Sequence, residues 1–329
     1  MSELRWNPTL EEWVITATHR QDRTFFPPAD FDPLAPTKPG GFPTEVPASN
    51  YEIVVFENKY PSLRREPPAP GVEGTELTPV LPAEGVCEVV CYTPQPDAEL
   101  ASLSVHKVEE LVTVWADRYD ELSAHPFVRY VYIFENKGRE IGVTLSHPHG
   151  QIYAYPFIPP IAERELNAAR KHYSKTGRNL YEDLLRQELS DGRRIVADNE
   201  AFVAVVPFYA RYPYEVHILA RAARTAISDF DAGERRALAG MMKVVMEKYN
   251  NLWLRSMPYV MLMHQRPSDG PAEDYQFYRF HVEFYPPYRT PDKLKFLAGS
   301  EAGAGAFIND TLPEATAMAL RETEPTGAV

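Results

Sequence analysis

Two segments of the chain space their apolar residues with the period of an α-helix. The first follows Ser104, a candidate N-cap, and its apolar stripe consists of Val105, Val108, Val112, Trp115, Tyr119 and Leu122. The second opens at Asp231, where Glu234 completes a capping box, and its stripe consists of Leu238, Met241, Val245, Tyr249 and Leu252. Both patterns predict amphipathic helices that bury one face.

Similar strand-forming segments flank both helices, which indicates an internal repeat. Two β-branched and aromatic runs precede each helix: YEIVVFENKYPS and VCEVVCYTP before the first, FVAVVPFYARYP and YEVHILAR before the second. Two more follow each helix: FVRYVYIFENK and SHPHGQIYAYPFIPP, then PYVMLMHQRP and YRFHVEFYPPY. The offset is 130 residues for Tyr119 and Tyr249 (249 − 119) and 134 for His147 and His281 (281 − 147). We therefore predict a duplicated α+β unit with mainly antiparallel sheet, divided into residues 1–190 and 191–329.

The composition excludes several classes of protein. The net charge of −12 argues against duplex nucleic acid as a partner, because such proteins usually carry a basic face. We expect no membrane segment, because no apolar run reaches about 18 residues, and we expect a cytoplasmic location, because the N-terminus is too polar and acidic for a signal peptide. Cys87 and Cys91 lie four residues apart in a predicted strand. A separation of about 13 Å is beyond disulfide reach, so both are expected to be buried thiols.

The segment SHPHGQIYAYP carries the chemistry that stands out. Strand alternation places His147, His149 and Gln151 on one face, where all three can contact a single ligand. A nucleophilic histidine needs one unprotonated nitrogen aimed at its target and the other nitrogen held by an acceptor, and Gln151 can donate to an oxyanion. Alternatives from these residues alone are a pair of metal ligands or two ordinary surface histidines. Lys137 and Thr144, just upstream, favour a phosphate ligand.

The sequence around this motif resembles a known family. The segments FENKYPSL, FENKGREIGVTLSHPHGQIYAYPF, FHVEFYPP and KLKFLAGSE, in this order, are similar to the galactose-1-phosphate uridylyltransferases of the histidine-triad superfamily, from about Arg20 to Glu301. The resemblance implies a duplicated histidine-triad-like fold whose sheet forms a half-barrel with helices packed outside. It also implies transfer of UMP from UDP-glucose to galactose 1-phosphate through a covalent uridylyl-histidine, with ping-pong kinetics and a role in galactose metabolism.

The resemblance assigns roles residue by residue. It makes His149 the nucleophile and Gln151 a phosphate ligand, and it places His147, the first histidine of the motif, among the catalytic residues. The other substrate-binding residues that it implies are Arg20, Arg23, Asn136, Gly142, Val143 and Thr144 around the diphosphate, and Phe56 and Asn58 at the uridine and ribose. Lys295, Ser300 and Glu301 resemble residues that reach the sugar phosphate bound by a neighbouring subunit. The expected partners are therefore a UDP-hexose, a hexose 1-phosphate and a second copy of the chain, as a homodimer.

The chain departs from the family at both of its metal sites. The positions of two cysteines and a histidine hold Asp32, Ala35 and Pro96, so no zinc is expected there, and His147 would orient its loop by hydrogen bonding, with Asp32 supplying part of the cross-link. At the second site, one of three histidines is replaced, leaving Glu165, His264, His281 and Glu283. This set suits a structural zinc or iron, and a metal-free hydrogen-bonded cluster is the alternative. Glu283 is expected at the place that the nucleophile holds in the first half. A family glutamine falls at or near Phe307, which leaves the identity of the hexose open.

Three other functions remain open from the sequence. An ADP-sugar or dinucleoside-polyphosphate phosphorylase of the same superfamily would keep the covalent histidine and change the base or acceptor. A catalytically silent nucleotide-binding protein would keep the fold alone. A zinc hydrolase using His147 and His149 is disfavoured, because no third ligand is evident nearby.

Overall fold

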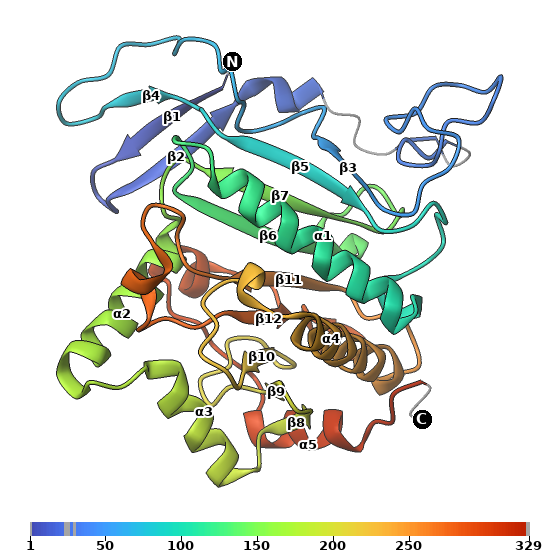
Figure 1. Cartoon of the computed structure of the whole chain (residues 1–329), viewed down its shortest axis with the longest axis vertical. Helices are drawn as coiled ribbons and strands as arrows, with labels where there is room; N and C mark the ends of the chain where they lie inside the picture. The colour runs from blue at the N-terminus through green and yellow to red at the C-terminus, as the bar shows by residue number, and fades with distance from the viewer. Residues whose placement is uncertain (1, 23–26, 29–30, 327–329) are drawn as a thin grey trace.

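The structure is a computed structural model that describes residues 2–22, 27–28 and 31–326 (Figure 1). Its main sheet contains nine antiparallel strands in the order β3-β5-β7-β6-β11-β12-β10-β9-β8. The strands of the first half are β3 (Val54–Glu57), β5 (Val86–Cys91), β6 (Tyr130–Lys137) and β7 (His149–Tyr155). Those of the second half are β8 (Ile195–Asp198), β9 (Phe202–Val205), β10 (Val216–Ala220), β11 (Tyr259–His264) and β12 (His281–Tyr285). Strands β6 and β11 join the halves at the centre of the sheet.

The order of the strands confirms the predicted duplication. Reading outward from the centre gives β6, β7, β5, β3 on one side and β11, β12, β10, β9 on the other, so each of these eight strands has a counterpart in the other half, and β8 is an additional edge strand. The two predicted helices are α1 (Val105–Ser123), capped by Ser104, and α4 (Ala232–Leu252), whose capping box is Asp231 and Glu234. They lie side by side on one face of the open sheet (Figure 1). The α+β fold with an antiparallel sheet and no closed barrel is therefore as expected.

Strand alternation divides the sheet into two faces. Ile133, Ile152, Ile218 and Val282 point toward α1 and α4 and belong to the main hydrophobic core. His149, Gln151, His281 and Glu283 occupy the alternate positions of β7 and β12. Their side chains therefore project from the opposite face, which we call the site face.

The site face is covered differently in the two halves. Helices α2 (Pro160–Thr176) and α3 (Leu180–Asp191) pack over the second half, where Leu166 and Tyr181 meet Tyr278 and Leu185 meets Val203. Over the first half, loops of the N-terminal region contribute Leu34 and Tyr51 to a smaller cluster that includes Val89. The prediction of a division after residue 190 stays a prediction.

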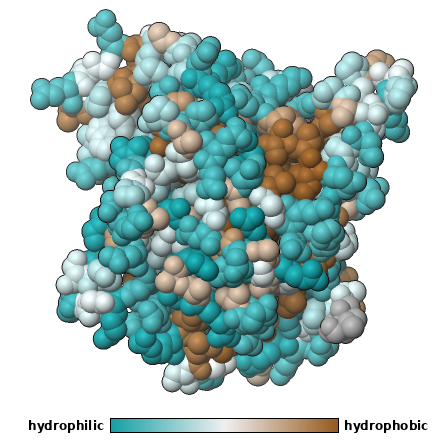
Figure 2. All heavy atoms as spheres, viewed as in Figure 1, coloured by the Kyte–Doolittle hydropathy of each residue, from teal (hydrophilic) through white to brown (hydrophobic). Residues whose placement is uncertain are grey.

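The remaining elements frame the sheet. Strands β1 (Ser2–Asn7), β2 (Glu12–Ala17) and β4 (Val80–Pro82) form a second antiparallel sheet near the first half. The C-terminal tail contains β13 (Tyr288–Thr290), β14 (Lys293–Leu294) and α5 (Pro313–Glu322), and short 3₁₀ or π turns connect several elements. Cys87 and Cys91 are free and buried, as predicted. Among the described residues no helix is long and apolar enough to cross a membrane. Figure 2 shows a mainly hydrophilic surface on the helical face, with a hydrophobic area near the N-terminal loops.

Candidate active site and metal cluster

The local structure of the motif fixes the tautomer of His149. This residue begins β7, and its Nδ1 lies 2.7 Å from the carbonyl oxygen of His147. A carbonyl only accepts, so Nδ1 carries the proton and donates, and the lone pair is on Nε2. Gly150 follows on the helical face, where a Cβ would lie 2.2 Å from the Tyr92 hydroxyl oxygen. Only glycine therefore lets the strand pass between His149 and Gln151 without displacing Tyr92.

Two cavities meet at His149. The larger, of about 870 Å³, is lined on one side by Asn136, Val143 and Thr144 and on the other by loop residues such as Phe31 and Pro96. The smaller, of about 230 Å³, is lined by Asn58, Tyr60, Val89 and Gln151 among others. His149 and Leu145 line both cavities. A ligand that spans the two would therefore have His149 among the residues beside it.

His147 is a buried residue in the wall of the larger cavity, and it cross-links loops. Its Nδ1 donates to Asp32 Oδ2 at 2.6 Å, and its Nε2 lies 2.8 Å from the Thr93 carbonyl oxygen and 2.7 Å from the Tyr51 hydroxyl. Burial would raise the pKa of Asp32, but hydrogen bonds from His147 and the Leu34 amide outweigh it and hold that pKa below its ordinary value. The expected hydrogen-bonding role of His147 and the cross-link through Asp32 are both present. Ala35 has no ligand atom in its side chain, and Pro96 lines the larger cavity.

The other predicted substrate residues fall into two groups. Asn136, Val143, Thr144, Asn58 and Gln151 line the cavities. Arg20, Phe56 and Gly142 lie outside the lining: Arg20 Nη1 donates to the Tyr60 carbonyl at 2.9 Å, Phe56 packs in the cluster beneath the cleft, and Gly142 ends a turn with φ +86°. Arg23 lies outside the described residues.

The predicted tail residues do not reach the cleft of their own chain. Lys295 Nζ pairs with Glu301 Oε1 at 3.3 Å and donates to the Ile308 carbonyl, and Ser300 Oγ donates to the Ala306 carbonyl at 2.7 Å. None of the three lines either cavity. Polar contacts within the tail therefore occupy all three side chains.

The predicted metal ligands come together on the site face of the second half. Glu165 comes from α2, His264 from the end of β11, and His281 and Glu283 from β12, and one ligand atom from each lies within 4.8 Å of the others. His264 Nδ1 donates to Glu165 Oε2 at 2.9 Å, whereas the buried His264 Nε2 has no hydrogen-bond partner. An orphaned imidazole nitrogen beside two carboxylates fits a divalent zinc or iron ion. His147 and His149 do not belong to a cluster of this kind among the described residues, which weighs against the zinc hydrolase.

The charges in this cluster depend on one another. Burial would lower the pKa of His264, but the carboxylates of Glu165 and Glu283 overcome it and raise that pKa to about 9. Burial would likewise raise the pKa of Glu283, and the surrounding His217, His264 and His281 hold it well below its ordinary value. Ion pairs between the carboxylates and the histidines therefore hold the four side chains together.

Three residues around the cluster escaped the sequence analysis. His217 Nε2 lies 3.2 Å from Glu283 Oε1 and 2.8 Å from Glu215 Oε1, and Arg211 Nη2 lies 3.6 Å from Glu283 Oε2. Alternation of Glu215 and His217 in YEVHILAR was a signal, because both side chains had to share one face of a buried strand. Nothing in the sequence pattern indicated Arg211, which reaches the cluster from a loop.

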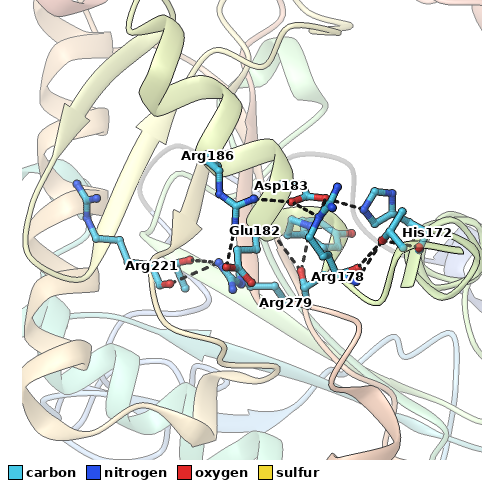
Figure 3. Close-up of polar contacts among 11 residues, drawn as sticks. His172, Arg178, Glu182, Asp183, Arg186, Arg221 and Arg279 are labelled. Carbon is cyan, nitrogen blue, oxygen red and sulfur yellow. Dashed lines mark hydrogen bonds and ion pairs between the residues drawn. The ribbon is translucent and has the colours of Figure 1, made fainter. Parts of the chain in front are cut away.

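The structure corrects the alignment of the two halves. His281 Nδ1 donates to the carbonyl oxygen of Arg279, two residues before it, at 3.0 Å, as His149 does to His147. Both histidines begin their strands, so His281 matches His149 with an offset of 132 (281 − 149), and Glu283 matches Gln151 instead of the nucleophile. Arg279 takes the place of His147. Its buried guanidinium donates to the carbonyls of Ala220 and Arg221, close to Glu182 (Figure 3).

Comparison with known proteins agrees with this arrangement. Residues 1–159 match the N-terminal domain, and residues 165–326 the C-terminal domain, of galactose-1-phosphate uridyl transferase. The chain belongs to this family.

Its relatives in the family match over most of their length. A galactose-1-phosphate uridylyltransferase of Thermotoga maritima is 43% identical over 98% of this chain and 99% of its own, and one of Rattus norvegicus is 34% identical over 97% and 86%. A solved structure of a uridylyltransferase superposes with a TM-score of 0.86 at 32% identity, covering 98% of both chains. An ADP-glucose phosphorylase from Arabidopsis thaliana, at 24% identity and a TM-score of 0.73, shares the fold.

Proposed function

We propose that this member of the family is a UDP-glucose:hexose-1-phosphate uridylyltransferase that moves UMP from UDP-glucose to galactose 1-phosphate. The observation that carries the proposal is the position of His149, with its tautomer fixed by a backbone carbonyl, where two cavities meet. Relatives named galactose-1-phosphate uridylyltransferase, matched over most of their length, support the choice of substrates.

The tautomer of His149 suits both half-reactions. Nε2 attacks the α-phosphorus of UDP-glucose, a nitrogen–phosphorus bond forms, and the bond to the bridging oxygen breaks, so that glucose 1-phosphate leaves with both bonding electrons. A phosphate oxygen of galactose 1-phosphate then attacks the uridylyl group, UDP-galactose forms and the imidazole is released. The proton stays on Nδ1 throughout and remains hydrogen-bonded to the carbonyl oxygen of His147, whose fixed dipole stabilises the positive charge that develops on the ring.

The flanking residues would bind the two ends of the substrate. Gln151 would donate to a non-bridging oxygen of the α-phosphate, and Asn136, Val143 and Thr144 would line the side that holds the second phosphate and the sugar. Asn58 would contact the nucleoside in the smaller cavity, with Phe56 supporting it from below. Arg20 and Gly142 would act through the loops that border the cleft, and the diphosphate-binding role of Arg23 stays a prediction because that residue lies outside the described ones.

The tail would act in a homodimer, and the cluster would stabilise the fold. Lys295, Ser300 and Glu301 do not line the cavities of their own chain, and we propose that they reach the sugar phosphate bound by a second copy in a homodimer. Zinc or iron held by Glu165, His264, His281 and Glu283 would cross-link α2 to β11 and β12 and leave the reaction to His149. The expected cytoplasmic location stays a prediction.

A half-reaction without acceptor tests the function. The protein is incubated with UDP-glucose alone, and the moles of glucose 1-phosphate released per mole of enzyme subunit are measured. The proposal expects about one equivalent per active subunit and continued release once galactose 1-phosphate is added. Release with ADP-glucose and none with UDP-glucose would identify a phosphorylase instead. No release with either would favour the silent nucleotide-binding protein.

A further inference from the structure

The loop at residues 210–213 connects the metal cluster to the C-terminal tail. Glu215, which is fully buried, fixes this loop: its Oε2 accepts the backbone amides of Arg211 at 2.6 Å and Tyr212 at 3.0 Å. Its Oε1 accepts from His217 at 2.8 Å. One buried carboxylate thus holds both the loop and His217, which lies beside the cluster.

Arg211 contacts the cluster with one end of its guanidinium. Nη2 lies 3.6 Å from Glu283 Oε2 and donates to the Tyr285 hydroxyl, which in turn donates to the same carboxylate oxygen. Glu283 is 3% exposed, so its charge needs partners inside the protein. Arginine remains charged at all accessible pH values and therefore supplies a permanent counter-charge.

The same guanidinium supports the tail. It lies 5.3 Å from the centre of the Phe307 ring and 5.0 Å from that of Tyr285. Next to it, Asn309 Nδ2 donates to the Ala210 carbonyl at 3.0 Å. Within the tail, Glu301 pairs with Lys295 and accepts the Ile308 amide at 3.3 Å. Phe307 and Asn309 are therefore the points at which the segment that carries Lys295, Ser300 and Glu301 is fastened to the loop.

We propose that Arg211 is a positioning residue that fastens the tail segment 299–309 to the Glu165–His264–His281–Glu283 cluster. The carboxylate of Glu283 sets the place of the guanidinium, and the guanidinium sets the place of Phe307. The geometry of the cluster then decides where Ser300 and Glu301 stand. The consequence for catalysis rests on the proposed function, in which these residues complete the sugar-phosphate site of a second copy.

Amide hydrogen exchange of the full-length protein tests the connection. In R211M, which keeps the length of the side chain and removes its charge, segment 299–309 should exchange about three- to tenfold faster. F307A removes the contact from the other end and should loosen the same segment. Because Phe307 is 37% exposed, this variant keeps the fold even if R211M does not. R289M is the matched control, because it breaks the exposed 3.1 Å ion pair of Arg289 with Asp310 in the same tail without touching the cluster.

The partnership of Arg211 with Glu283 is tested by a double-mutant cycle. E283Q should also loosen segment 299–309, and E283Q combined with R211M should loosen it no further than R211M alone. Additive effects would mean that the two residues act independently. Unchanged exchange of the segment in both R211M and F307A would overturn the proposal.

Kinetics separate a positioning role from general destabilisation. R211M should raise the KM for galactose 1-phosphate about three- to tenfold and leave kcat and the amount of uridylyl-enzyme at saturating UDP-glucose near the parent values. A loosened tail with an unchanged KM would refute the catalytic consequence. If the parent forms no uridylyl-enzyme at all, the proposed function fails, and the exchange measurement still decides the structural connection.

Discussion

The two halves of this molecule share one framework and differ in what covers their site faces. In the first half, loops surround the face and leave two cavities that meet at His149. In the second half, α2 and α3 close over the face, and the matching His281 is 1% exposed. The same strand position thus carries an accessible imidazole in one half and a sealed one in the other. The sheet sets the geometry of both histidines, and the segments packed over it decide whether a substrate can reach them.

The halves also match position by position on the site face. Gln151 pairs with Phe134 in its sheet and Glu283 with Leu262, so that Asn136 and His264, two residues further along, are equivalent. Asn136, His149 and Gln151 correspond to His264, His281 and Glu283. Neutral amides beside the first imidazole suit an anionic phosphate, whereas a carboxylate and a second imidazole suit a cation. The two sites therefore differ at two of these three strand positions, and Glu165 from α2 completes the group in the second half.

The largest expected difference between the halves is in turnover. H149A should lower turnover with UDP-glucose and galactose 1-phosphate by at least about 10⁴-fold, because it removes the covalent step. H281A should keep turnover within about tenfold and instead lower stability by about 2–4 kcal/mol, because a buried network is broken. Steady-state assays and thermal melts of both variants make the comparison. Equal losses of turnover would contradict the division of roles.

Because Gln151 and Glu283 occupy matching positions, the glutamate of the second half can be introduced at position 151 of the first half. Q151E adds a carboxylate where a donor amide should face the α-phosphate, and it should lower kcat about 10²- to 10³-fold with little change in stability. E283Q, the reverse exchange, should change kcat much less. A Q151E variant as active as the parent would show that position 151 does not face the phosphate.

The helical side of the sheet differs at Glu135, whose counterpart by the same register is the apolar Met263. Burial raises the pKa of Glu135 to about 7 from 4.5. A carboxyl whose pKa is higher in the folded than in the unfolded state is least destabilising below pH 4.5 and costs stability increasingly as pH rises to about 7.

The free energy of unfolding of E135Q, relative to that of the parent, should therefore increase by about 3 kcal/mol between pH 4.5 and pH 8. Urea unfolding at both pH values measures this difference, and D120N, an exposed acid on α1, serves as control. A constant difference between E135Q and the parent across this range would show that Glu135 ionises as in the unfolded chain.

The smallest expected effect concerns Asp32. Its pKa is lowered in the folded protein, so its contribution is present above its ordinary value of 3.8 and is lost as pH falls through the depressed value. D32N should cost about 1–3 kcal/mol near pH 7, because the Nδ1 donor of His147 loses a charged acceptor. D310N, in an exposed ion pair, should cost less than about 1 kcal/mol. Equal costs would show that the cross-link adds nothing to stability.

The sequence was enough for the framework and for the residues that share a strand. Period and capping predicted α1 and α4, and alternation predicted that His149 and Gln151 share a face, because these properties depend only on local geometry. The match of His281 with His149 was missed by two residues, because hydrophobic patterns of period two fit equally well at either register. Arg211 and Tyr51 were also missed. Both reach their sites from loops, whose paths depend on tertiary packing and leave no periodic signal.

The most direct measurement is the location of the uridylyl group. The protein is mixed with UDP-glucose without acceptor, quenched, digested at a pH that preserves nitrogen–phosphorus bonds, and its peptides are analysed by mass spectrometry. The uridylyl group should be found on His149 and disappear when galactose 1-phosphate is added before the quench. A group on any other residue, or an unmodified His149 peptide from protein that still turns over, would contradict the account.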